Sequence, residues 1–125
     1  MNSYNTEITL EKVIDALISM SVESWRFSRI SSRLASKLDA AEQKRYKSQF
    51  LWFDKKLKDA LNQVGFNLVN VEGQPFDPGM AVTPLNIEEF EVDDILCVDQ
   101  MLEPIIMGKN GLVKTGTVTL RRVTS

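Results

Sequence analysis

The chain contains no histidine among its 125 residues. Histidine is the commonest general base and the commonest metal ligand, so its absence excludes triads and dyads built on an imidazole. No glycine-rich loop is followed by a helix in the way that a phosphate-binding loop requires. We therefore expect a protein that is not an enzyme, with no cofactor, no metal site and no small-molecule substrate.

The chain contains a single cysteine, Cys97, and no long apolar run. A lone cysteine cannot form an internal disulfide, which fits a reducing compartment, and we expect a cytoplasmic protein with Cys97 as a buried structural thiol. No apolar run approaches the ~20 residues that span a membrane. The first residues have neither a basic nor an apolar region, so we expect no signal peptide and no membrane partner.

Positive charge is scarce in the second half of the chain. Residues 1–64 have a net charge of +3, whereas residues 65–125 contain four basic and nine acidic residues and have a net charge of −5. Because nucleic-acid affinity comes largely from phosphate neutralisation, this balance disfavours a nucleic-acid partner. We expect a solvated basic strip at Arg26, Arg29 and Arg33. The dense acidic run lacks an EF-hand frame and is expected to be a solvated loop; it comprises Glu88, Glu89, Glu91, Asp93 and Asp94.

The first pattern along the chain is a heptad repeat. Apolar and small side chains recur at spacings of three and four at Leu10, Val13, Leu17, Met20, Ser24, Phe27, Ser31, Leu34 and Leu38. The pattern predicts a helix over residues 6–37, with Thr6 as N-cap and Glu7 in the first turn. A second stripe, displaced by one residue, comprises Tyr46, Phe50, Phe53, Leu57, Ala60 and Val64.

The phase break between the two stripes predicts two helices. Asp39 and Glu42 form a capping-box pattern at the break, and Gly65 is placed to end the second helix, so we expect this helix over residues 40–64. We expect an antiparallel hairpin; one bent helix is the alternative, because no glycine or proline marks the turn.

The apolar faces of the two helices are too wide for one hairpin to bury. They could pack on the rest of a monomer, but we favour a homodimer in which two hairpins form a four-helix bundle, since Leu51 and Trp52 lie off the main stripe and need a second contact. The expected dimerisation residues are Leu10, Val13, Leu17, Met20, Phe27, Phe50, Phe53 and Leu57.

Short β-prone segments with frequent turns follow Gly65. We expect β structure over residues 66–71 and 80–85, a central strand over 95–100, a short edge strand over 104–107, and a last strand over 113–123. Asn110-Gly111 predicts a hairpin turn. The expected fold class is α+β, with a helical dimerisation hairpin at residues 1–64 and a small antiparallel all-β domain, a barrel or sandwich, at residues 65–125.

The second half resembles the C-terminal β domain of the GrpE family. The resemblance rests on Val64-Gly65-Phe66, Phe76-Asp77-Pro78 with Ala81-Val82, the strand Ile95-Leu96-Cys97-Val98-Asp99-Gln100 and the strand Leu112-Val113-Lys114-Thr115-Gly116-Thr117-Val118. Upstream, Val13-Ile14-Asp15-Ala16-Leu17 is similar to a helix of the family's bundle. The match covers about residues 10–123 and implies a divergent member without the family's long N-terminal coiled coil.

The resemblance implies a co-chaperone that acts as nucleotide-exchange factor for a DnaK-like ATPase. It places the contacts with the chaperone's nucleotide-binding domain on Lys114, Gln100, Met101 and Leu102. Lys114 stands where the family has an arginine, and Met101-Leu102-Glu103-Pro104 replaces the family's Gly-Tyr. These departures motivate the alternative of a GrpE-like adaptor that dimerises and binds a protein partner without exchange activity.

Overall fold

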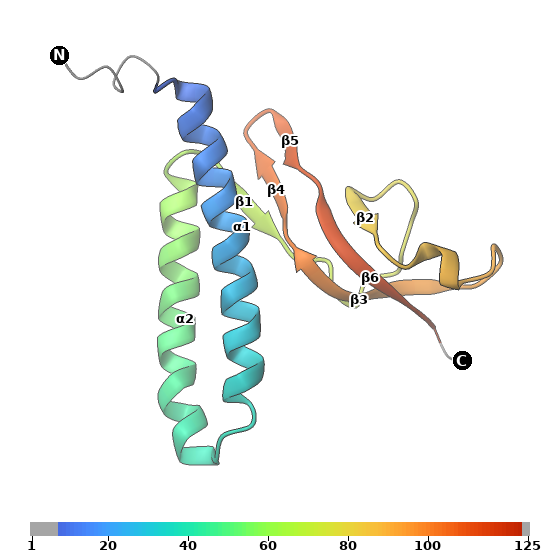
Figure 1. Cartoon of the computed structure of the whole chain (residues 1–125), viewed down its shortest axis with the longest axis horizontal. Helices are drawn as coiled ribbons and strands as arrows, with labels where there is room; N and C mark the ends of the chain where they lie inside the picture. The colour runs from blue at the N-terminus through green and yellow to red at the C-terminus, as the bar shows by residue number, and fades with distance from the viewer. Residues whose placement is uncertain (1–7, 124–125) are drawn as a thin grey trace. The chain divides into compact units, whose positions relative to one another are not determined.

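The computed structural model describes residues 8–123. Two helices are followed by short strands, which confirms the expected α+β class with a helical hairpin ahead of a small, mainly antiparallel β domain (Figure 1). The elements are α1 (Leu10–Ala35), α2 (Ala40–Asn62), β1 (Asn67–Val69), β2 (Val82–Pro84), the short 3₁₀ helix η2 (Ile87–Glu89), β3 (Leu96–Glu103), β4 (Ile105–Gly108), β5 (Gly111–Lys114) and β6 (Gly116–Arg122).

Helix α1 begins later than the sequence predicts. Its N-cap is Thr9, whose side-chain oxygen accepts a hydrogen bond of 3.1 Å from the backbone N–H of Lys12. A threonine in this position satisfies one of the amide groups that the first helical turn leaves unpaired. Thr6 and Glu7, the expected first residues, lie outside the described part of the chain, and the assignment of Thr6 as the N-cap of this helix is wrong.

The turn at residues 36–39 closes without glycine or proline because side chains satisfy its backbone. The Gln43 amide donates to the carbonyl oxygens of Ser36 (2.8 Å) and Leu38 (2.7 Å). The Asp39 carboxylate accepts 2.9 Å from the Glu42 N–H, which confirms Asp39 as the N-cap of α2. The alternative of one bent helix is therefore wrong.

Helix α2 ends at Asn62, two residues before the expected end at residue 64, and the glycine that the sequence indicates as its stop closes the turn that follows. Gly65 has a φ of 80°, in the left-handed region that favours glycine. The N–H of Phe66 donates to the carbonyl of Leu61 and that of Gly65 to the carbonyl of Asn62, both at 3.0 Å. This pair of bonds is a Schellman motif, which satisfies carbonyls that the last helical turn leaves free.

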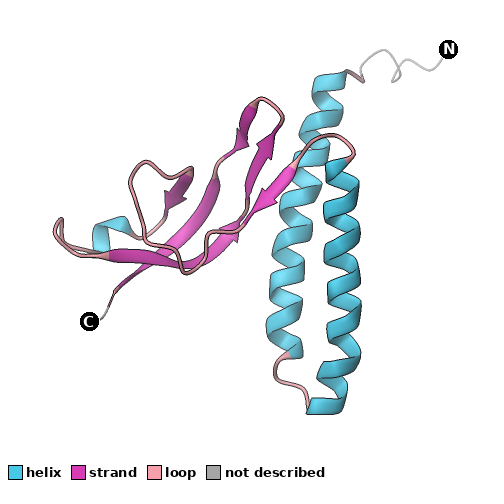
Figure 2. Ribbon diagram, turned by 180° about the vertical axis from the view of Figure 1, so that it is seen from behind, coloured by secondary structure: helices cyan, strands magenta, loops and turns pink. Residues whose placement is uncertain are grey.

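The strands form two three-stranded sheets, ordered β1-β4-β5 and β2-β6-β3 (Figure 2). All pairs are antiparallel except β2 with β6, in which Val82 lies opposite Gly116. The expected 104–107 edge strand is wrong, because β4 lies in the middle of its sheet. The expected central strand over 95–100 is also corrected: β6 is central, although residues 73–76 bond to the free side of β3.

One long two-stranded ribbon connects the two sheets. β3 continues through Pro104 into β4, turns at Gly108–Gly111, and returns through β5 and Thr115 into β6. The turn confirms the Asn110-Gly111 prediction, and Gly111 has a φ of 116°. The expected single strand over 113–123 is instead two strands in different sheets. Proline lacks an N–H to donate to a ladder, so the ribbon changes sheet at Pro104.

The core of the β region lies along this ribbon. Its buried side chains include Leu96, Cys97, Val98, Met101, Ile105, Ile106, Val118 and Leu120. Cys97 is buried, as expected for a structural thiol. The chain divides into one compact unit that ends at Phe50 and a second that begins at Leu51, inside α2. Neither helix, over the described residues, is long and apolar enough to cross a membrane.

Candidate functional site

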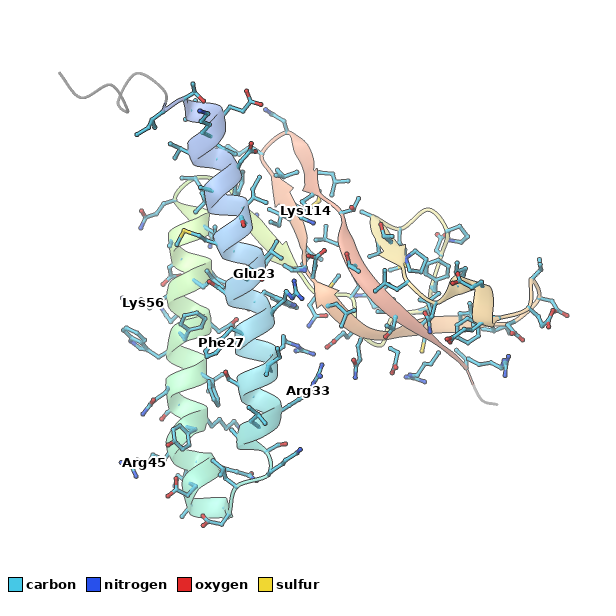
Figure 3. All side chains as sticks on the ribbon, in the orientation of Figure 1. Glu23, Phe27, Arg33, Arg45, Lys56 and Lys114 are labelled. Carbon is cyan, nitrogen blue, oxygen red and sulfur yellow. The ribbon has the colours of Figure 1, made fainter. Side chains whose placement is uncertain are left out.

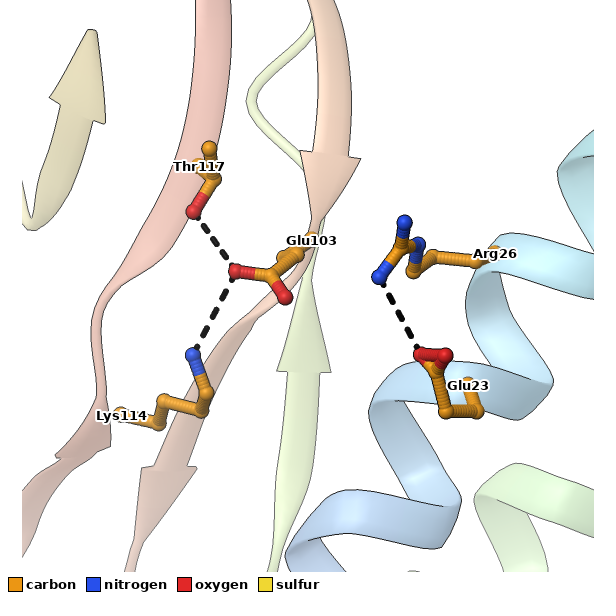
Figure 4. Close-up of polar contacts among 5 residues, drawn as sticks. All are labelled: Glu23, Arg26, Glu103, Lys114 and Thr117. Carbon is orange, nitrogen blue, oxygen red and sulfur yellow. Dashed lines mark hydrogen bonds and ion pairs between the residues drawn. The ribbon is translucent and has the colours of Figure 1, made fainter. Parts of the chain in front are cut away.

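Lys114 lies at the end of β5 and is about one-third exposed. The expected contact with a partner depends on this residue. Its ammonium is 3.6 Å from a carboxylate oxygen of Glu103, the last residue of β3 (Figure 4). The same oxygen accepts a hydrogen bond of 2.7 Å from the Thr117 hydroxyl. Lys114 is thus not a free cation, and a partner carboxylate would compete with Glu103 for it.

Sequence reasoning missed Glu103 and Thr117. The signal was the hairpin register: plain counting back from the Gly108–Gly111 turn places Glu103 opposite Gly116, two residues from Lys114, and the register shift between Ile106 and Met107 moves its observed partner to Thr117. Side chains opposite or diagonal to one another in an antiparallel pair are within reach of each other. A carboxylate at position 103 could therefore have been matched to Lys114 by counting residues on either side of the turn.

Gln100 and Leu102, expected beside Lys114 in the contact, lie on β3. Gln100 is exposed and sits opposite Thr119, while Leu102 is half-buried. Both precede Glu103 on the strand by no more than three residues. The structure therefore places Gln100 and Leu102 on β3 within three residues of Glu103, the residue that pairs with Lys114 close to the change of sheet.

Met101 does not lie on this surface, so its assignment as a contact residue is corrected. Its side chain is 1% exposed and belongs to the core. The register of β3 against β6 shifts between Val98 and Gln100 and again between Met101 and Glu103. Each shift inserts one extra residue into β3, which resets the alternation of side chains between the two faces. Strict alternation from the buried Val98 would have turned Met101 outward.

The expected dimerisation residues of α1 are largely exposed. Val13, Met20, Phe27 and Leu34 follow one another at seven-residue intervals, and Met20 and Phe27 are 67% and 69% exposed. Phe27 is labelled in Figure 3. Leu10 is exposed and Leu17 half-buried. The buried residues of the helix, Ser21, Val22 and Trp25, lie on its opposite side. We call Val13, Met20, Phe27 and Leu34 the α1 stripe; its contact with a second copy stays a prediction.

The expected dimerisation residues of α2 are half-buried or moderately exposed. Phe50 and Leu57 are half-buried, whereas Phe53 is 38% exposed. Tyr46 stacks on Phe50 with 6.4 Å between ring centroids. Leu51 and Trp52, which the sequence places off the main stripe, are exposed, with the Lys56 ammonium 5.5 Å from the Trp52 ring. Exposed apolar side chains that gather into a contiguous patch mark an interaction surface.

The acidic run lies in the η2 region and the loop after it. Asp94 accepts hydrogen bonds from the Arg122 guanidinium (3.0 Å) and the Glu91 N–H (2.8 Å). The Arg122 bond, followed by the Glu91 bond, lowers the pKa of Asp94 below its usual value. No group of three or more acidic or cysteine side chains converges to hold a metal ion anywhere in residues 8–123.

No protein-family model matches the chain, and no curated protein and no solved structure matches it significantly.

Proposed function

We propose that the chain is a homodimeric, GrpE-like co-chaperone that promotes ADP release from a DnaK-like ATPase in the cytoplasm. The observation that carries the proposal is that one chain presents two separate surfaces. One is the exposed α1 stripe on a helical hairpin; the other is the Gln100, Leu102 and Lys114 surface on a β ribbon. The order of these parts agrees with the resemblance of residues 10–123 to the GrpE family.

The mechanism needs no chemistry from this chain. A factor that binds the open form of a nucleotide-binding domain better than the closed form shifts the population toward the open form, from which ADP escapes. The size of the shift is set by the difference between the two affinities alone. A rigid β surface is suited to this task because it does not have to be ordered when it binds.

Substitution of Lys114 tests the proposal. The choice of variants has to take account of the ion pair between Lys114 and Glu103. Lys114→Glu would remove an attraction for a partner carboxylate, but it would also set two carboxylates against each other within the ribbon. The charge swap Glu103→Lys with Lys114→Glu keeps an internal ion pair and reverses the charges offered to the partner. The pair itself, being partly exposed, contributes only about 0.2–1 kcal/mol.

The experiment measures release of fluorescent ADP from the cognate DnaK-like ATPase. We expect the wild-type chain to accelerate release, and both Lys114→Glu and the charge swap to lose the acceleration. Equal unfolding curves for wild type and charge swap would show that the loss is one of contact. Loss of affinity through a rim charge should shrink as salt is added.

Two outcomes would change the proposal. Acceleration by the charge swap at the wild-type rate would remove Lys114 from the contact. Binding of the wild type to the ATPase without acceleration would favour the adaptor, in which the dimer holds a partner and leaves nucleotide release unchanged. The observation that favours the adaptor, the second candidate function, is the ion pair of Lys114 with Glu103 in the free chain.

A further inference from the structure

The β region carries a groove that the proposed function does not use. The groove has a volume of about 410 Å³, within the range of ligand pockets in proteins. Its apolar lining includes Phe76, Pro78, Phe90 and Leu96, from the segment before β2 and the segment around η2 and β3. Val92, which also lines the groove, is fully exposed.

The lining also contains carboxylates, and their pairing is uneven. Asp94 is engaged by Arg122, whose guanidinium also lies 5.8 Å from the centroid of the Phe90 ring. For Glu88 and Glu91, by contrast, the described part of the chain provides no ion pair. Two uncompensated carboxylates at an apolar groove favour a ligand that brings positive charge and apolar surface together.

The geometry restricts the class of that ligand. The acids do not converge in the way that a metal ion requires, at least among residues 8–123, so an extended ligand fits better than a bound cation. Residues 65–125 have a net charge of −5, which repels an anionic surface such as a phospholipid membrane or nucleic acid.

We propose that this groove docks a basic segment of a partner protein, with one or two large apolar side chains seated against Phe76, Phe90 and Leu96 and with Lys or Arg side chains paired to Glu88 and Glu91. The apolar anchors supply most of the affinity, since buried anchors dominate peptide interfaces. The carboxylates supply orientation and speed the encounter. The groove shares no residue with the Gln100, Leu102 and Lys114 surface, so the two proposals stand independently.

The test uses the full chain and a fluorescein-labelled synthetic peptide of twelve residues that combines leucines with lysines at helical spacing. A second peptide has glutamate in place of every lysine. Fluorescence anisotropy should show binding of the lysine peptide alone. Glu88→Lys with Glu91→Lys should weaken that binding by about tenfold, because two attractions become repulsions. Val92→Ser should weaken it by about threefold through lost apolar contact.

The matched control is Glu11→Lys with Asp15→Lys, which changes the net charge by the same amount at exposed positions of α1. This variant should bind the lysine peptide within about twofold of the wild type, because neither residue lines the groove. Equal losses in the control and groove variants would show attraction to net charge and overturn the proposal. So would unchanged binding by the groove variants. If sedimentation showed that Glu88→Lys with Glu91→Lys breaks up an oligomer, the occupant would be a second copy, which also overturns it.

Discussion

At the scale of single residues, the end of α2 depends on a backbone conformation that only glycine adopts without strain. Gly65→Ala should lower the free energy of unfolding by about 1 kcal/mol, because a side chain disfavours a φ of 80°. The added Cβ would also lie 2.7 Å from the Lys109 side chain, which is flexible and can move away. Urea unfolding measures the difference.

Gly79→Ala is the matched control for Gly65→Ala. Gly79 does not have a positive φ, and a Cβ there would meet the Asp77 carboxylate at an ordinary 3.5 Å. This variant should change the free energy of unfolding by no more than about 0.5 kcal/mol. An equal loss in the two variants would contradict the assignment of strain to Gly65.

Asp94 makes the stability of the β region depend on pH. Its pKa is lowered in the folded chain by Arg122 and by the Glu91 N–H, so the ionised form stabilises the fold. That contribution is complete above the unfolded pKa of about 3.9 and is lost as the pH falls through the lower folded pKa. The difference in free energy of unfolding between wild type and Asp94→Asn should therefore be constant from about pH 5 to 7 and shrink below about pH 4. Urea titrations at each pH measure it, and a difference that persists at the lowest pH would refute the linkage.

At the scale of elements, the hairpin turn depends on the cap of α2. Asp39→Ala removes the oxygen that accepts from the Glu42 N–H and should cost about 1 kcal/mol of stability. Asp39→Asn, which keeps an oxygen in the same place, should cost much less. Thermal unfolding followed by circular dichroism compares the three chains. If the two substitutions cost the same, the effect would come from the lost charge at the helix N-terminus.

What the sequence predicts correctly at this scale is local. The Asp39 cap, the Gly65 stop and the Asn110-Gly111 turn each depend on residues within one turn of one another. The errors concern pairings between distant strands. Nothing local in β3 marks its two register shifts, which arise from its match to β6 and turn Met101 into the core. Likewise, the central position of β4 is decided by its pairing with β1, almost forty residues away along the chain.

At the scale of the whole molecule, the α1 stripe leads to a prediction about assembly. The wild-type chain should sediment as a dimer, because large apolar side chains at seven-residue intervals on a helix are typical of a helical seam. Phe27→Asp should give a monomer of 14.2 kDa, since a charge buried in such a seam is costly unless paired. Phe53→Asp on α2 should have the same effect.

The control for the assembly prediction is Ser19→Asp, at a position of α1 outside the stripe. It should leave the dimer intact. A wild-type chain that sediments as a monomer at micromolar concentration would show that the stripe is not a self-association surface.

The two-stranded ribbon has a consequence for the order of folding. Its first pair, Gly108 with Gly111, is separated by three residues, and its last, Leu96 with Arg122, by twenty-six. Closing a short loop loses less chain entropy than closing a long one, so the ribbon should zip outward from its turn. The strands at its sides, β1 and β2, pair with β4 and β6 across longer stretches of chain, so they should join after the ribbon has formed. Substitutions in the turn should therefore slow refolding, whereas substitutions near Leu96 should mainly speed unfolding.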